Sequence, residues 1–164
     1  MGRLTAMAAD PSPFMRRAIE LSRIHMRAGE GGPFGAVVVR EGRILGEGWN
    51  RVTSGHDPTA HAEITAIREA CRVLGTFALR GCQLFTSCEP CPMCLAAIYW
   101  ARLDRVWYAN TRADAAAIRF DDEWLYREVA LPVEARSLPA SQLLRDEALA
   151  VFQEWDGKPD RMPY

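Results

Sequence analysis

The order of apolar and polar residues along the chain predicts alternating helices and strands. Ser12 followed by Pro13 is typical of a helix start, and apolar side chains then recur at helical spacing as far as Gly29. Residues 34–39 form a compact β-branched run, and residues 43–49 can return beside them after a glycine turn. The first quarter of the chain therefore predicts a helix followed by an antiparallel hairpin.

The middle of the chain predicts a loop and then two strands separated by a helix. Residues 50–59 are polar and rich in turn formers, and the helical pattern of residues 61–74 is closed by a glycine. Residues 82–86 and 105–108 are typical strands, and between them a helix starts at Pro92 and continues through Tyr99. Strands alternating with crossover helices predict an α/β domain with a helix-covered sheet.

The last third of the chain predicts helices rather than strands. Residues 120–129 and 141–155 carry the helical pattern, and residues 158–164 are expected to form an untethered tail. A length of 164 residues fits one domain, with boundaries at 1–164.

Composition and charge narrow the class of partner. The chain is 49% hydrophobic and 25% charged, as in soluble globular proteins, and its net charge of −1 predicts no binding to nucleic acid. No apolar run approaches the length of about 20 residues that spans a bilayer, so no membrane partner is expected. The first residues lack the apolar core of a signal peptide, which predicts a cytoplasmic location.

Three of the five cysteines, Cys88, Cys91 and Cys94, lie within one short segment, a spacing that favours metal binding over disulfides. Cys91 and Cys94 are three residues apart in the first turn of a helix, so both sulfurs can face one ion. His61, at the start of another predicted helix, can complete a ligand trio. Three protein ligands leave the fourth tetrahedral position open, which is typical of a catalytic zinc ion.

Glu63 follows the predicted histidine ligand by two residues and is not needed to bind the metal. It is free to take a proton from water, pass it to a ring nitrogen, and then protonate a departing amine. His61, Glu63, Pro90, Cys91 and Cys94 together match H-x-E followed by P-C-x-x-C, the known signature of zinc-dependent nucleobase deaminases.

Two alternatives leave the chain without catalysis. Cys88 could act as a fourth ligand and close a structural zinc site, in which case Glu63 would have no role. The whole chain could also be a zinc-stabilised binding module. Both alternatives predict that replacing Glu63 has no functional effect.

At these residues the sequence resembles the cytidine deaminase-like superfamily and, within it, the bacterial guanine deaminases. The resemblance extends over nearly the whole chain, and the segments that carry it are residues 31–37, Asn50, 57–63, 86–94, 97–102, 120–122 and Tyr164. It implies a three-layer α/β/α fold with a five-stranded mixed sheet and one zinc ion per subunit. It further implies a homodimer with shared active sites, in which a C-terminal segment of about residues 138–164 is exchanged.

The resemblance also implies roles for residues around the metal. Asp122 would bind guanine and assist proton transfer, Asn50 would hydrogen-bond the polar edge of the base, and Phe34 would flank it. The remaining substrate contacts that it implies are Ala62, Trp100 and Tyr164. From the residues alone, Phe34 and Trp100 can equally be core residues, Asn50 a turn former, and Asp122 a helix N-cap.

Hydrolysis of guanine to xanthine and ammonia is the function that follows from this resemblance. The nearest rival is a tRNA adenosine deaminase, which shares the H-x-E and P-C-x-x-C motifs but needs a basic surface to bind RNA. Cytosine deamination is a second rival, which the Phe120-Asp121-Asp122 segment disfavours.

Overall fold

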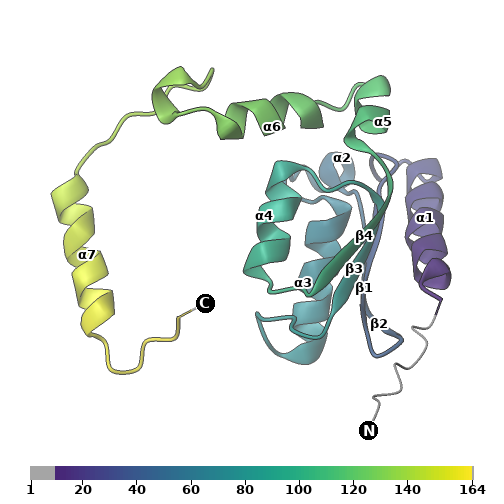
Figure 1. Ribbon diagram of the computed structural model, residues 1–164, viewed down its shortest axis with the longest axis horizontal. Coiled ribbons are helices and arrows are strands. Elements are labelled where there is room, and N and C mark those ends of the chain that lie inside the picture. Colours follow the sequence, from purple (N-terminus) through teal and green to yellow (C-terminus); the bar gives the residue numbers. More distant parts are fainter. Residues whose placement is uncertain (1–9, 164) are drawn as a thin grey trace, which may run out of the picture.

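The computed structural model describes residues 10–163 and contains one four-stranded mixed sheet in the order β2-β1-β3-β4 (Figure 1). Its strands are β1 (Gly35–Arg40), β2 (Arg43–Trp49), β3 (Gln83–Cys88) and β4 (Arg105–Asn110). β1 runs antiparallel to both β2 and β3, whereas β3 and β4 are parallel and joined by a crossover helix. The predicted hairpin is confirmed.

Helices cover both faces of this sheet and form three layers, as Figure 1 shows. α1 (Ser12–Arg27) packs on one face, and α3 (Ala62–Leu74) and α4 (Pro92–Trp100) pack on the other. Alternate residues of β1 pack against the helices on opposite faces of the sheet, because successive side chains of a strand point to opposite faces. Val37 belongs to the core cluster beneath α1, and Val38 belongs to the cluster beneath α3.

Two glycines of β2 allow α3 to lie unusually close to the sheet. A Cβ atom at Gly46 would collide with the Ala66 carbonyl oxygen, and one at Gly48 would collide with the Ala62 carbonyl oxygen. Since Ala62 is the first residue of α3, this close approach fixes where that helix begins. The N-terminus of α3 is therefore set by contact with the sheet as well as by local sequence.

Most predicted elements are confirmed, with small shifts at their ends. α1 begins at Ser12 with Pro11 at the N-cap, and α3 ends as predicted, at Gly75 in the left-handed conformation. Two short helices were not predicted: α2 (Val52–Gly55) lies inside the expected loop, and α5 (Arg112–Ala117) follows β4. The Thr111 capping box starts α5, and its side chain accepts a hydrogen bond from the Asp114 backbone nitrogen.

The expectation of a five-stranded sheet is wrong for the described residues, which form four strands. After β4 and α5 the chain forms α6 (Asp122–Ala130) and a single 3-10 turn, η1 (Val133–Ala135). The segment between α6 and the last helix contains Pro132 and Pro139, which have no backbone N–H to donate to a sheet. This segment does not add a strand beside β4.

The last helix, α7 (Arg145–Gly157), lies to one side of the sheet and its covering helices, beyond α4 (Figure 1). It confirms the predicted C-terminal helix, although it starts four residues later than expected. All of its side chains are solvent-exposed, including Phe152 at 74%. Among residues 10–163, no helix is both long and apolar enough to cross a membrane.

Candidate metal and active site

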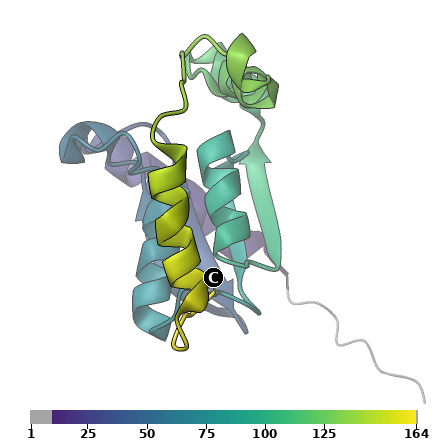
Figure 2. The same ribbon diagram turned by 90° about the vertical axis from the view of Figure 1, so that its left-hand side faces the viewer.

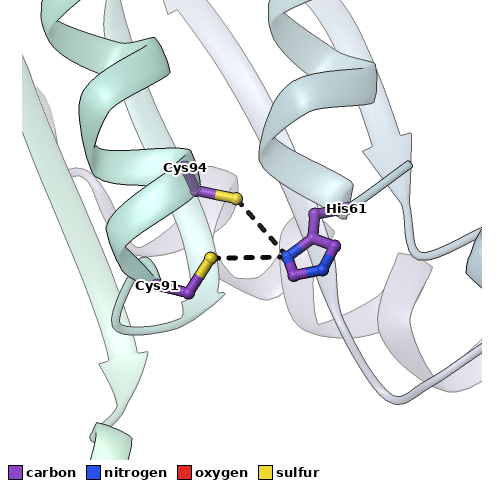
Figure 3. Close-up of side chains that lie close together, drawn as sticks. All are labelled: His61, Cys91 and Cys94. Atoms are coloured by element: carbon purple, nitrogen blue, oxygen red, sulfur yellow. Dashed lines mark hydrogen bonds between the residues drawn. The ribbon is translucent and has the colours of Figure 1, made fainter. Parts of the chain in front are cut away.

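His61 and Cys91 occupy equivalent positions at the starts of two neighbouring helices. Each is the N-cap residue of its helix, α3 or α4, and has an extended backbone conformation. Neither side chain makes a capping hydrogen bond. Both side chains are thus available to turn toward one point between the helices, where Cys94 joins them from the first turn of α4 (Figure 3).

The spacing of the three ligand atoms suits a zinc ion. His61 Nδ1 lies 3.6 Å from Cys91 Sγ and 3.5 Å from Cys94 Sγ, and all three atoms lie within 4.8 Å of one another. Tetrahedral zinc, with bonds of about 2.3 Å to sulfur and about 2.0 Å to nitrogen, separates the two kinds of ligand by about 3.5 Å. The described site therefore fits zinc in chemistry and in size, and zinc is the cofactor of this protein.

Electrostatics prepare one of the two thiols for the metal. The hydrogen bond from Cys94 lowers the pKa of Cys91 to about 4, and the hydrogen bond with His61 contributes to this effect. The same bond with Cys91, together with burial, raises the pKa of Cys94. The close contact between the two sulfurs thus favours one negative charge on the pair, and metal binding displaces the proton that remains.

Glu63 lies beside the ligand trio without belonging to it. Its side chain is buried, and this burial raises the pKa of the carboxyl group, which favours the protonated form. Its Oε2 atom lies 3.4 Å from Cys94 Sγ, and its Oε1 atom accepts a hydrogen bond of 3.1 Å from the Thr86 hydroxyl. A group held in this way can accept and return a proton next to the metal.

A small cavity opens in front of these residues and brings together three of the predicted substrate contacts. Phe34, Asn50 and Asp122 line it together with His61, Glu63 and Cys91. A larger hollow, between β2 and α3, contains none of the predicted ligands or substrate contacts. The smaller cavity is therefore the chemical site.

Asn50 is fixed by the backbone around it. The side chain is 5% exposed, and its Oδ1 atom accepts hydrogen bonds from the backbone nitrogens of Gly32 and Val52, each at 3.2 Å. Its role as a turn former is thereby confirmed. Because the carbonyl oxygen is occupied, the amide N–H groups are the donors that Asn50 can offer in the cavity.

Asp122 and Phe34 lie far apart in the sequence, and both line the cavity. Asp122 is the first residue of α6, and the N-cap position belongs to Asp121, so the alternative that Asp122 caps this helix is wrong. Burial raises the pKa of its carboxyl group. Phe34 meets the Phe120 ring edge-on, with ring centroids 4.8 Å apart. This aromatic pair joins the hairpin to the residues just before α6.

Cys88 lines the cavity but is not a member of the ligand group. Its thiol donates to the Thr111 carbonyl oxygen at 3.6 Å, and burial raises its pKa to about 12. The arrangement therefore gives no support to a closed structural site with Cys88 as the fourth ligand.

Two other predicted contacts, Ala62 and Trp100, are not among the described residues that line the cavity. Ala62 is fully buried in the core beneath α3, so its predicted contact with the substrate stays a prediction. Trp100 lies at the end of α4 near α7 and is 59% exposed, which shows that the alternative of a core residue is wrong for this chain. Tyr164 lies outside the described residues.

Thr86 and Glu89 are functional candidates that were not predicted. Thr86 is a polar residue, 1% exposed, in a strand whose buried residues include one other polar side chain, Ser87, and a polar residue in such a strand is a usable sequence signal. Glu89 lines the cavity and accepts a hydrogen bond of 3.0 Å from the backbone nitrogen of Arg112. Its partner lies 23 positions away, so the sequence offers no sign of it.

The fold and the metal trio define a class of zinc-dependent enzyme. Residues 9–110 match the family described as the cytidine and deoxycytidylate deaminase zinc-binding region, and the chain belongs to this family. Within it, the chain is similar to guanine deaminase from Bacillus subtilis strain 168. The two are 52% identical over 151 residues, which cover 92% of this chain and 97% of the relative.

Solved structures agree with this relationship. The X-ray structure of the Bacillus subtilis guanine deaminase has a TM-score of 0.91 and 50% identity, covering 94% of this chain and 99% of that chain. A guanine deaminase from Nitrosomonas europaea has a TM-score of 0.66 and 33% identity, covering 93% and 88% of the two chains. The tRNA-specific adenosine deaminase of Aquifex aeolicus is 42% identical over 96 residues, covering 58% of this chain and 63% of the relative.

Proposed function

We propose that this protein hydrolyses guanine to xanthine and ammonia. The observation that carries the proposal is the extent of the similarity to guanine deaminase. It covers 92% of the chain and so includes most of the region after β4, whereas the match to the tRNA adenosine deaminase covers 58%. The near-neutral net charge of −1 also disfavours a tRNA substrate.

The residues of the cavity account for the reaction. When bound, a zinc ion in such a site supplies Lewis acidity and makes a hydroxide nucleophile available near neutral pH. Glu63 takes the proton that water gives up and passes it to a ring nitrogen as the C–O bond forms at C2 of guanine. It then takes the proton of the new hydroxyl group and gives it to the amino group, whose C–N bond breaks. The products are xanthine and ammonia.

Recognition of the base falls to the side chains across from the metal. Asp122 as a carboxylate accepts hydrogen bonds from the N–H groups of the guanine edge, and Asn50 donates to an acceptor of the ring. Phe34, braced by Phe120, flanks the face of the base. Buried polar groups of this kind reject analogues that lack the matching partner.

We also propose that the protein acts as a homodimer in which residues 138–164 are exchanged. Support comes from large aromatic side chains that are exposed on this side of the chain: Tyr99 of α4 is 71% exposed, and Phe152 of α7 is 74% exposed. Figure 2 shows the side of the molecule that carries α7. A second copy would cover this surface and shield it from water. The expected cytoplasmic location stays a prediction.

One comparison of substrates tests the reaction. Purified protein with bound zinc is given guanine, adenine, cytosine or a tRNA, and the release of ammonia is followed. Guanine is expected to be the substrate that turns over fastest. Release of ammonia from the tRNA or from cytosine, but not from guanine, would show that the proposed substrate is wrong while leaving the deaminase class intact.

A further inference from the structure

Helix α6 brings Asp122 to the cavity although none of its side chains is fully buried. One of its attachments is a hydrogen bond of 2.7 Å from the Tyr126 hydroxyl to the carbonyl oxygen of Pro90. Tyr126 follows Asp122 by four residues, so the two side chains lie on the same face of the helix. The face of α6 that presents the Asp122 carboxylate is thus also the face that is hydrogen-bonded to Pro90, next to the metal ligand Cys91.

The residue bonded by Tyr126 directly precedes a metal ligand. Pro90 is buried and is followed in the chain by Cys91, the N-cap residue of α4. A shift of α6 relative to Pro90 therefore changes the separation between Asp122 and the ligand trio. Displacements of about 1 Å at such a site can lower turnover about a hundredfold.

Glu89 holds the same short segment through hydrogen bonds to residues of β4 and α5. Its carboxylate accepts a hydrogen bond from the Arg112 nitrogen, and its own nitrogen donates to the Asn110 carbonyl oxygen at 2.8 Å. The Arg112 guanidinium lies over the ring of Tyr126, 4.9 Å from its centroid. Glu89 and Tyr126 thereby link β4, α5 and α6 to the two residues that lead into Cys91.

We propose that Tyr126 is a positioning residue, which sets the distance between Asp122 and the metal site through its bond to the Pro90 carbonyl oxygen. The proposal rests on the function proposed above, because it assigns Asp122 to the base. Guanine must reach the carboxylate with one edge and the metal-activated nucleophile with C2. If α6 is held less firmly, guanine can make one of these two contacts only by losing the other.

The test uses the full-length, zinc-loaded protein and the variant Tyr126→Phe, which removes only the hydroxyl group. Loss of one hydrogen bond to a buried carbonyl is expected to lower kcat/KM for guanine roughly three- to tenfold. It is expected to weaken the binding of 8-azaguanine, a ligand present in a related mutant structure of 36% identity, by a similar factor. Zinc content should equal that of the wild type, and Tyr108→Phe, at a side chain of β4 that is 51% exposed, is the matched control.

A double-mutant cycle separates positioning from a general structural role. With Asp122 replaced by Asn, the further change Tyr126→Phe is expected to alter 8-azaguanine affinity less than twofold, because the two residues act as a unit. Additive effects, loss of zinc, or unchanged affinity and kcat/KM in the single variant would each overturn the proposal. Wild-type protein that releases no ammonia from guanine would instead overturn the proposed function.

Discussion

Glu63 shows how burial and neighbours give one side chain its role. Its carboxyl group is 6% exposed and is bonded to the hydroxyl of Thr86, yet it is not part of the metal-ligand group. Burial favours its protonated form, and the adjacent metal site favours the charged form when zinc is bound. These opposed influences suit a group that must accept a proton and then release it within one turnover.

Replacing Glu63 by Gln separates proton transfer from metal binding. We expect kcat of the variant to fall by a factor of about a hundred to ten thousand, because general acid–base catalysis accelerates reactions by a factor of that size. Zinc content, measured by elemental analysis, should remain at one ion per chain. The control Cys91→Ser removes a ligand and should lose zinc, and wild-type turnover in the Glu63→Gln variant would show that Glu63 is not the proton shuttle.

We expect the Thr86 hydroxyl to affect turnover through its hydrogen bond to the Glu63 carboxyl group. The variant Thr86→Val keeps the shape of the side chain but leaves the buried Oε1 atom without its donor. We expect kcat for guanine to fall roughly three- to tenfold at unchanged zinc content, from the usual contribution of one hydrogen bond. Thr86→Ser, which keeps the hydroxyl, should restore turnover, and equal activity of the Val and Ser variants would contradict this account.

At the scale of elements, the helices hold the site by their N-termini. α3 and α4 both begin at N-cap residues whose side chains are turned to the metal rather than to the helix. The partial positive charge of these two helix ends favours thiolate and hydroxide at the same point. Close packing of α3 against Gly46 and Gly48 keeps one of the two ends in place.

On the other face of the sheet, α1 is fastened to β2 by an ion pair. Arg17 donates two hydrogen bonds to Glu47, from Nε at 2.7 Å and from the terminal nitrogen at 2.8 Å, and its guanidinium lowers the pKa of Glu47. A lowered folded-state pKa means that the pair stabilises the fold above the unfolded-state pKa of about 4.3. That stabilisation is lost as the pH falls through the lower pKa of the folded state.

Denaturant unfolding of Glu47→Gln should reveal this dependence. At pH 7 we expect the free energy of unfolding to fall by roughly 0.2–1 kcal/mol, a range appropriate to a pair that remains partly exposed. The difference from wild type should shrink as the pH is lowered below about 4. Glu134→Gln, at an exposed side chain outside the ion pairs of the described residues, is the control. A difference that is constant with pH would exclude the ion pair as its cause.

The whole molecule leaves a large apolar surface on α4 and α7, which the proposed dimer would cover. Replacing Phe152 by Asp places a charge on this surface, and burying an unpaired carboxylate costs several kcal/mol. We therefore expect sedimentation to show a dimer for the wild type and a monomer for Phe152→Asp, with weakened guanine turnover. Gln153→Asp adds the same charge at the next exposed position and should remain dimeric.

Either a wild-type monomer or a dimeric Phe152→Asp variant would contradict the proposed exchange. These outcomes bear on assembly alone, since the metal trio and Glu63 all come from residues of one chain. The guanine assay would then report whether a single chain suffices for the reaction.

Local spacing in the sequence determined the metal centre and most helices and strands. His61, Cys91 and Cys94 could be predicted because helix starts, prolines and an i,i+3 spacing fix geometry within a few residues. The same signals predicted the β1–β2 hairpin and the limits of α3. They also predicted a reaction class, because three ligands and an unattached glutamate suit hydrolytic deamination.

The tertiary structure alone decided which distant residues meet. Thr86 is hydrogen-bonded to Glu63, 23 positions away in the sequence, and Tyr126 is hydrogen-bonded to Pro90, 36 positions away. No local pattern reveals either contact. The resemblance-based fifth strand failed for the same reason, since strand pairing depends on a partner edge and not on propensity alone. Local physics placed the zinc ligands, and long-range packing decided what surrounds them.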